Sequence, residues 1–390
     1  MKYFRRWLWG MVVAVLLLGA RGTAVAQTPS LESSVDYAYG QKVTFRLTGQ
    51  MPEAIEKIEL FVNLAQAETP LSVDVRFSQE NSQLIAGYDL DPTLAGLPPF
   101  GQVVYWWALT TANSATLMVP EARFTYRDDR FDWRELAQAD LTVYWTGNDA
   151  NLGQTAWEIA DDSREKLDHL LPPTAVSPLN VYIYPSTADL RAGLRLAGRD
   201  WQDGHVDPDL DVLLVTAVNP LTAAADLSQT IPHELTHLRL HRLSETAVLP
   251  FWYEEGLALV AAEADAGSAE LVAGAVANDT ALTLLSLCTA FPQAEAEEEL
   301  ALAQSSSVLR YIQAQFGDQA LRQLGANYLA GAGCEAGLSQ TLGISLAELN
   351  ADWQAAQRPQ PAWRTFLSQN GLWLLLLLVS FGFLALLLRR

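Results

Sequence analysis

The run of residues 233–237, His-Glu-Leu-Thr-His, constrains this chain more than any other feature of its sequence. On an α-helix, residues four positions apart lie on one face, so His233 and His237 can hold one metal ion between them. Glu234 lies one position round the helix, where it can act on a water at the metal rather than bind the metal itself. The chain has only five histidines, so a chance match to this spacing is uncommon. The run therefore predicts a helix that carries a metal site, with a solvated helix and two incidental histidines as the alternative.

A second acidic motif follows the histidine run. Glu255 lies 18 residues after His237 and directly precedes Gly256. Zinc in a catalytic site usually takes three protein ligands and leaves a fourth position for water. We therefore predict one Zn²⁺ per chain, held by His233, His237 and Glu255. Glu234 is the predicted general base.

Together these motifs resemble those of the gluzincin metallopeptidases. The histidine run, followed by the pattern P-x-W-x-x-E-G-L-A at residues 250–258, is similar to the peptidase MA-like group, which is related to the aminopeptidase N and thermolysin families. In those families the glutamate before the glycine is the third zinc ligand, which maps onto Glu255 rather than Glu254. The resemblance extends over about residues 135–357. It implies an α+β zincin-like (gluzincin) catalytic domain and zinc-dependent hydrolysis of a polypeptide substrate.

The chemistry that this resemblance implies is metal-assisted hydrolysis. Zinc lowers the pKa of its water toward about 7 and polarises the substrate carbonyl, while Glu234 takes the water proton and later delivers it to the leaving amine. Aminopeptidase N-like enzymes stabilise the oxyanion with a tyrosine downstream of the third ligand, but Leu302 stands at that place here. Tyr311 and Tyr253 are the nearest alternatives, with Tyr311 as the candidate transition-state donor. The G-x-M-E-N motif that binds a substrate N-terminus is absent from the sequence, which favours an endopeptidase.

Two other functions stay open, and one class of partner is excluded. The missing tyrosine is compatible with a non-catalytic surface binding or adhesion protein that retains a metallopeptidase-like fold, although the intact ligand set argues against it. A zinc hydrolase that acts on a non-peptide amide has the same motifs. The formal net charge of −20 argues against nucleic acid as a partner.

Both ends of the chain are apolar. Residues 1–26 read as a signal peptide, with basic residues at its start, an apolar stretch and an Ala-x-Ala cleavage site; an uncleaved N-terminal anchor is the alternative. Residues 371–388 contain no charge and are followed by two arginines at 389–390, which predicts a transmembrane helix with a cytoplasmic end; a lipid-anchor signal with a removable tail is the alternative. Residues 359–370 form a tether. We therefore expect a single-pass protein of the cell membrane with an extracytoplasmic catalytic domain.

The chain has two cysteines, Cys288 and Cys334, which both follow the zinc motifs. An exported compartment permits a disulfide. We predict that they form one, with two buried free thiols as the alternative.

Apolar periodicity predicts two domains. Within residues 27–130, short alternating runs such as 42–47 and 58–62 are separated by turn residues and indicate an all-β sandwich of the immunoglobulin or fibronectin type, without a disulfide. Residues 131–358 begin with alternating strands and helices and become almost entirely helical from Phe251. This second stretch is the predicted metallopeptidase domain.

The zinc motifs occupy two predicted helices. Proline is tolerated in the first turn of a helix, so Pro232 indicates that the zinc helix begins near Ile231 and runs to Arg242. A second helix, at about residues 251–264, carries Glu255 and packs against the first.

Three further features near these helices bear on the site. The apolar strand expected at 211–218 is a candidate to pair with an extended substrate. His241 continues the spacing of four but lies one turn too far along to share the same metal, so we expect it to contact a ligand side chain or to lie on the surface. His205 reads as a turn residue, with a position facing the cleft as the alternative.

Overall fold

The structure is a computed structural model that describes residues 29–64, 69–175, 177–194, 204–244, 246–264, 268–358, 366, 370–371, 373–377 and 379–380. The predicted signal peptide at residues 1–26 lies outside these. The chain divides between Arg130 and Phe131 into two units, which are described one at a time.

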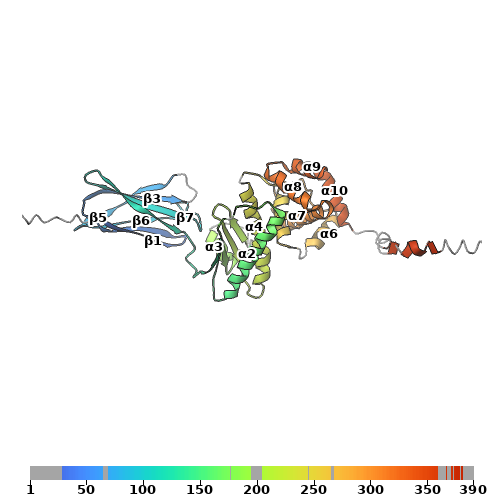
Figure 1. Ribbon diagram of the computed structural model, residues 1–390, viewed down its shortest axis with the longest axis horizontal. Helices are drawn as coiled ribbons and strands as arrows, with labels where there is room; N and C mark the ends of the chain where they lie inside the picture. Colours follow the sequence, from blue (N-terminus) through green and yellow to red (C-terminus); the bar gives the residue numbers. More distant parts are fainter. Residues whose placement is uncertain are drawn as a thin grey trace, which may run out of the picture. The chain divides into compact units, whose positions relative to one another are not determined.

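The first unit is a sandwich of two four-stranded sheets (Figure 1). One sheet has the order β1 (Ser30–Ala38), β2 (Lys42–Gln50), β6 (Gln83–Leu90) and β5 (Phe77–Glu80). The other has the order β4 (Leu71–Asp74), β3 (Ile55–Leu64), β7 (Gln102–Thr111) and β8 (Thr116–Thr125). All neighbouring strands are antiparallel. If the strands are lettered in chain order, the first sheet has the order A, B, E, D and the second has the order C′, C, F, G, as in immunoglobulin-like sandwiches.

Alternating apolar side chains hold the two sheets together. Val43, Phe45 and Leu47 of β2 are fully buried, and so is Trp107 of β7. The sequence does not predict strand β1 (Ser30–Ala38), because most of its residues are polar. In the structure its side chains alternate between exposed and partly buried, and none is fully buried.

The second unit begins with a five-stranded sheet in the order β12 (Gly204–Asp207), β13 (Val212–Thr216), β11 (Leu179–Tyr184), β10 (Leu141–Trp145) and β9 (Arg134–Gln138). The three central strands are parallel, and the two outer strands run antiparallel to their neighbours. The prediction that residues 211–218 pair with substrate is wrong, because β13 already has a strand on each side. The edge position belongs to β12, whose four residues are too short and polar to read as a strand.

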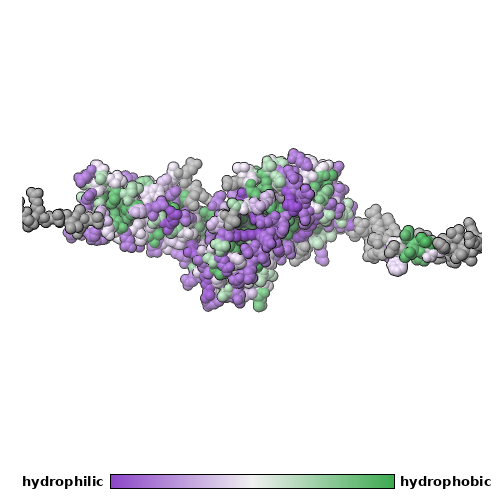
Figure 2. All heavy atoms as spheres, in the orientation of Figure 1, coloured by the Kyte–Doolittle hydropathy of each residue, from purple (hydrophilic) through white to green (hydrophobic). Residues whose placement is uncertain are grey.

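Helices cover this sheet and then build the rest of the unit. They are α2 (Ala150–Leu170), α3 (Thr187–Leu194), α4 (Ala223–Leu243), α5 (Phe251–Ala261), α6 (Ser268–Ala277), α7 (Glu295–Phe316), α8 (Asp318–Leu329), α9 (Cys334–Leu342) and α10 (Leu346–Gln357). The apolar faces of α2 and α4 share one core with the sheet, whereas α5 to α10 gather around a second core (Figure 1). The face shown in Figure 2 is largely hydrophilic over this unit, with scattered apolar residues.

The helix with the histidine run is longer than the sequence predicted. It begins at Ala223, so Pro232 lies in its interior rather than in its first turn. An interior proline removes one helical hydrogen bond and costs about 3 kcal/mol. Burial of Leu227 and Ile231, both fully enclosed, offsets that cost and extends the helix upstream of the proline.

A disulfide joins Cys288 to Cys334, which confirms the predicted bridge; their Cα atoms are 6.0 Å apart. It ties the segment between α6 and α7 to the first residue of α9. The carbonyls of Cys288 and Leu287 accept hydrogen bonds from the backbone N–H groups of Phe251 and Trp252. The bridged segment therefore caps the start of α5, whose first N–H groups have no partner within the helix.

The predicted C-terminal transmembrane helix is wrong. Within the described residues, no helix is long and apolar enough to cross a membrane. The single-pass cell-membrane localisation rested on that helix and falls with it. The predicted cytoplasmic end at 389–390 and most of the tether at 359–370 lie outside the described residues.

Candidate metal centre

Two helices bring three candidate ligand atoms together. His233 Nε2 lies 3.2 Å from His237 Nε2 on α4. Glu255 Oε2 on α5 lies 3.6 Å from the first of these nitrogens and 3.8 Å from the second. A tetrahedral zinc ion with bonds of about 2.0–2.1 Å separates its ligand atoms by roughly 3.3 Å. The three side chains therefore have the donor types and the spacing that zinc requires.

The side chains of the cluster are each partly exposed. The side chains of His233 and His237 are 22% and 17% exposed, and that of Glu255 is 26% exposed. The cluster is therefore partly open to solvent.

A fourth residue fixes the orientation of one histidine. Glu254 Oε1 lies 3.1 Å from His237 Nδ1, the ring nitrogen that points away from the other ligands. If Nδ1 carries the proton and donates it to this carboxylate, Nε2 is left with a lone pair for the metal. Such carboxylate–histidine pairs hold the ring and raise its basicity in zinc sites.

Close helix packing places Glu255 beside α4. The next residue, Gly256, lies against α7, where a Cβ atom would come within 2.8 Å of the Ser305 carbonyl oxygen. Only glycine permits this approach of α5 to the α7 backbone. The glycine of the sequence motif therefore supports the position of the glutamate before it.

The side chain of Glu234 extends from α4 toward the edge strand of the sheet. A Cβ atom on Gly204 of β12 would come within 2.7 Å of Glu234 Oε1 and 2.6 Å of Thr230 Cγ2. The absence of a side chain at Gly204 thus leaves room for the Glu234 carboxylate next to the strand. This contact gives the predicted base a fixed place beside the edge of the sheet.

The electrostatics of the protein's own groups differ for each member of the cluster. Burial, and then the charge of His237, lower the pKa of His233 to about 3. Burial lowers the pKa of His237, but the hydrogen bond with Glu254 and the charges of Glu255 and Glu234 outweigh it and raise that pKa to about 9. Burial raises the pKa of Glu234 to about 7. A carboxylate with this pKa can exchange a proton near neutral pH.

The two tyrosines considered as oxyanion donors lie elsewhere. Tyr253 is fully buried against Trp252 and Tyr328, and its hydroxyl has no hydrogen-bond partner among the described residues. Tyr311 follows Ser307 by four residues on α7, and Ser307 bonds Trp353 of α10. Tyr311 therefore lies on the face of α7 opposite the one that meets Gly256, which weighs against it as a donor. Its role stays a prediction.

Two further histidines considered from the sequence stand apart from the ligand group. His241 Nε2 lies 3.6 Å from Asp209 Oδ1 at the C-terminal end of α4. His205 lies in β12 rather than in a turn, paired with Leu214. Since side chains alternate along a strand, His205 points to the face of the sheet opposite the one where Gly204 meets Glu234.

Sequence reasoning missed two residues of this site. Glu254 could have been predicted, because a second carboxylate next to a metal ligand can accept a hydrogen bond from a histidine on the facing helix. Gly204 could not, because its contact with Glu234 depends on how β12 crosses α4, 30 residues further along the chain.

A comparison with protein families agrees with this geometry. A model described as the Peptidase MA superfamily matches residues 159–358, which are 200 of the 390 residues. The chain belongs to the Peptidase MA superfamily. This confirms the predicted peptidase MA-like membership. The Peptidase MA match includes both α4 and α5, so every residue of the metal cluster lies inside it.

Matches to solved structures are remote. Wild-type OgpA from Akkermansia muciniphila is 12% identical with a TM-score of 0.21, over 25% of this Peptidase MA chain and 29% of its own. A polysaccharide deacetylase from Bacillus cereus is 8% identical with a TM-score of 0.22, over 44% and 56%. A purple acid phosphatase from yellow lupin seeds is 8% identical with a TM-score of 0.22, over 52% and 40%. Such scores support no inference about function. No curated protein is significantly similar to the chain.

Proposed function

We propose that this protein is a zinc-dependent peptidase that hydrolyses polypeptides internally. The convergence of His233, His237 and Glu255 on one point within a Peptidase MA domain is the observation that carries the proposal. Zinc bound there supplies Lewis acidity for the scissile carbonyl and the attacking water. The rest of the chemistry falls to the side chains around it.

Glu234 is the general base. It follows the first ligand directly, and its carboxylate is held between α4 and Gly204. From this place it can take a proton from the attacking water onto a carboxylate oxygen and then pass it to the leaving amine.

The edge strand β12 is the proposed binding place for the substrate backbone. It is the outermost strand of the described sheet on the side of α4, and its Gly204 adjoins Glu234. An extended peptide can add to such an edge through main-chain hydrogen bonds. This mode requires no free terminus of the substrate, which supports cleavage within a chain.

The test compares hydrolysis and zinc content in the same samples of the full-length protein. Glu234→Gln should keep its zinc and lose hydrolysis of an unstructured protein substrate by about 10²–10⁴-fold, since the general base is removed. Glu270→Gln, an exposed change on α6 with the same loss of charge, should behave as the wild type. Unchanged hydrolysis in Glu234→Gln would refute the proposed mechanism.

A further inference from the structure

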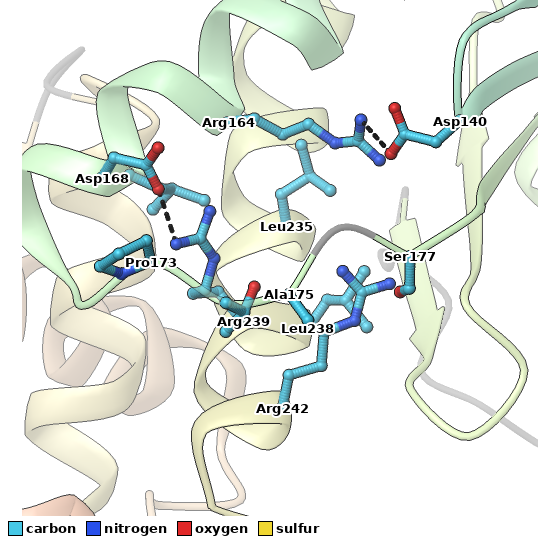
Figure 3. Close-up of a pocket in the computed structure, with 12 residues that line it drawn as sticks. Asp140, Arg164, Asp168, Pro173, Ala175, Ser177, Leu235, Leu238, Arg239 and Arg242 are labelled. Atoms are coloured by element: carbon cyan, nitrogen blue, oxygen red, sulfur yellow. Dashed lines mark hydrogen bonds and ion pairs between the residues drawn. The ribbon is translucent and has the colours of Figure 1, made fainter.

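A cavity of about 170 Å³ lies behind the metal helix. Its lining includes Leu235, Leu238 and Arg242 of α4, which stand roughly 140–200° round that helix from His233. Helix α2 and the segment before β11 form the other walls (Figure 3). The cavity is therefore separate from the metal cluster, although one helix serves both.

Three arginines line this cavity, and each is held by a carboxylate. Arg164 comes from α2, whereas Arg239 and Arg242 come from α4 (Figure 3). Arg164 Nη1 lies 2.9 Å from Asp140 Oδ2. Arg239 Nη1 donates to Asp168 Oδ1 at 2.7 Å and to the Pro172 carbonyl at 2.9 Å. Arg242 donates to Asp211 Oδ1 through Nε at 3.1 Å and also through Nη2. These contacts orient the guanidinium groups and fix their positions.

The arginines keep donors that these contacts do not use. A guanidinium has five N–H donors, and Arg164 and Arg239 each use only one nitrogen in the contacts above. Their side chains are only 23% and 10% exposed, and that of Arg242 is 19% exposed. These largely enclosed side chains therefore line the cavity with donors that the contacts above leave unused.

We propose that this cavity binds a small oxyanion of the phosphate or sulfate type. Planar guanidinium donors match the oxygens of such ions, and arginine is the residue most suited to recognise them. The volume admits a small ion with little else, since pockets for larger ligands measure about 300–1,000 Å³. A bound anion would join α2 to the back of α4.

The test is calorimetric titration of the full-length protein with inorganic phosphate at constant ionic strength. We expect saturable binding of one phosphate per chain that sulfate displaces and chloride does not. Arg164→Gln should weaken it about tenfold or more, as expected for loss of a charged hydrogen bond. Arg358→Gln, an exposed arginine paired with Asp279, is the matched control and should bind as the wild type.

Two further variants keep the outcome clear. Arg242→Gln should also weaken phosphate binding, which covers the case in which Arg164→Gln fails to fold. His237→Ala should bind phosphate normally, because the cavity does not involve the metal. Absence of saturable binding, binding as tight as in the wild type in both Arg164→Gln and Arg242→Gln, or loss of binding in His237→Ala alone would overturn the proposal. The peptidase proposal is unaffected by any of these results.

Discussion

Replacing Glu254 by glutamine should weaken zinc binding without removing any zinc ligand. Glu254 Oε1 lies 3.1 Å from His237 Nδ1, so its charge favours a protonated Nδ1 and a free Nε2. Glutamine keeps an acceptor for this bond but loses the charge. Loss of such a carboxylate partner typically costs 10- to 100-fold in metal affinity, or about 1.4–2.7 kcal/mol. Since the Glu254 side chain is 33% exposed, water screens the interaction, and we expect a value of about tenfold.

Zinc affinity would be measured by competition with a chromophoric chelator at fixed pH and ionic strength. Glu270→Gln removes one acidic charge at an exposed site on α6 and serves as the control for net charge. Glu254→Ala, which loses the acceptor as well, should bind zinc less tightly than Glu254→Gln. If Glu254→Gln and the control bind zinc equally, the carboxylate does not support His237 and the reasoning fails.

Three other changes test separate parts of the structure. Gly204→Ala should retain zinc but lower kcat by about 10- to 100-fold in a hydrolysis assay, because the new methyl group displaces the Glu234 carboxylate; unchanged kcat would contradict that contact. Cys288→Ser opens a disulfide of sequence separation 46, so denaturant titration should show a loss of up to about 4 kcal/mol that reductant reproduces in the wild type. Bonds from Ser345 lower the pKa of Glu348 from 4.5, so the stability that this carboxylate contributes is present above about pH 4.5 and lost as pH falls. The unfolding midpoints of wild type and Glu348→Gln should therefore differ at pH 7 and converge at acid pH.

The two histidines of the metal cluster could be predicted to lie together because they are close in the sequence. His233 and His237 are one helical turn apart, and helical spacing alone brings them to one face. The position of Glu255 needed a second motif, since the sequence does not state how α5 turns back on α4. The structure supplies that step through Gly256, which lets α5 pack against α7.

Other features depend on packing that no local pattern reports. Strand β12 was missed because its residues alternate too briefly, and it forms only by pairing with β13. The start of α4 was misplaced because Pro232 was read as a first-turn residue, whereas burial of Ile231 keeps it inside a longer helix. The membrane helix was predicted from hydropathy alone, and the described helices do not include one of spanning length.

The zinc content of His237→Ala tests the central claim most directly. Full-length wild-type protein, loaded with zinc and then freed of loosely bound metal, should contain one zinc ion per chain by elemental analysis. His237→Ala should contain almost none, because two ligands cannot hold the ion through that treatment. His241→Ala, one turn further along α4 and paired with Asp209, is the matched control and should retain one zinc. Full zinc in His237→Ala, or equal loss in both variants, would contradict the metal centre.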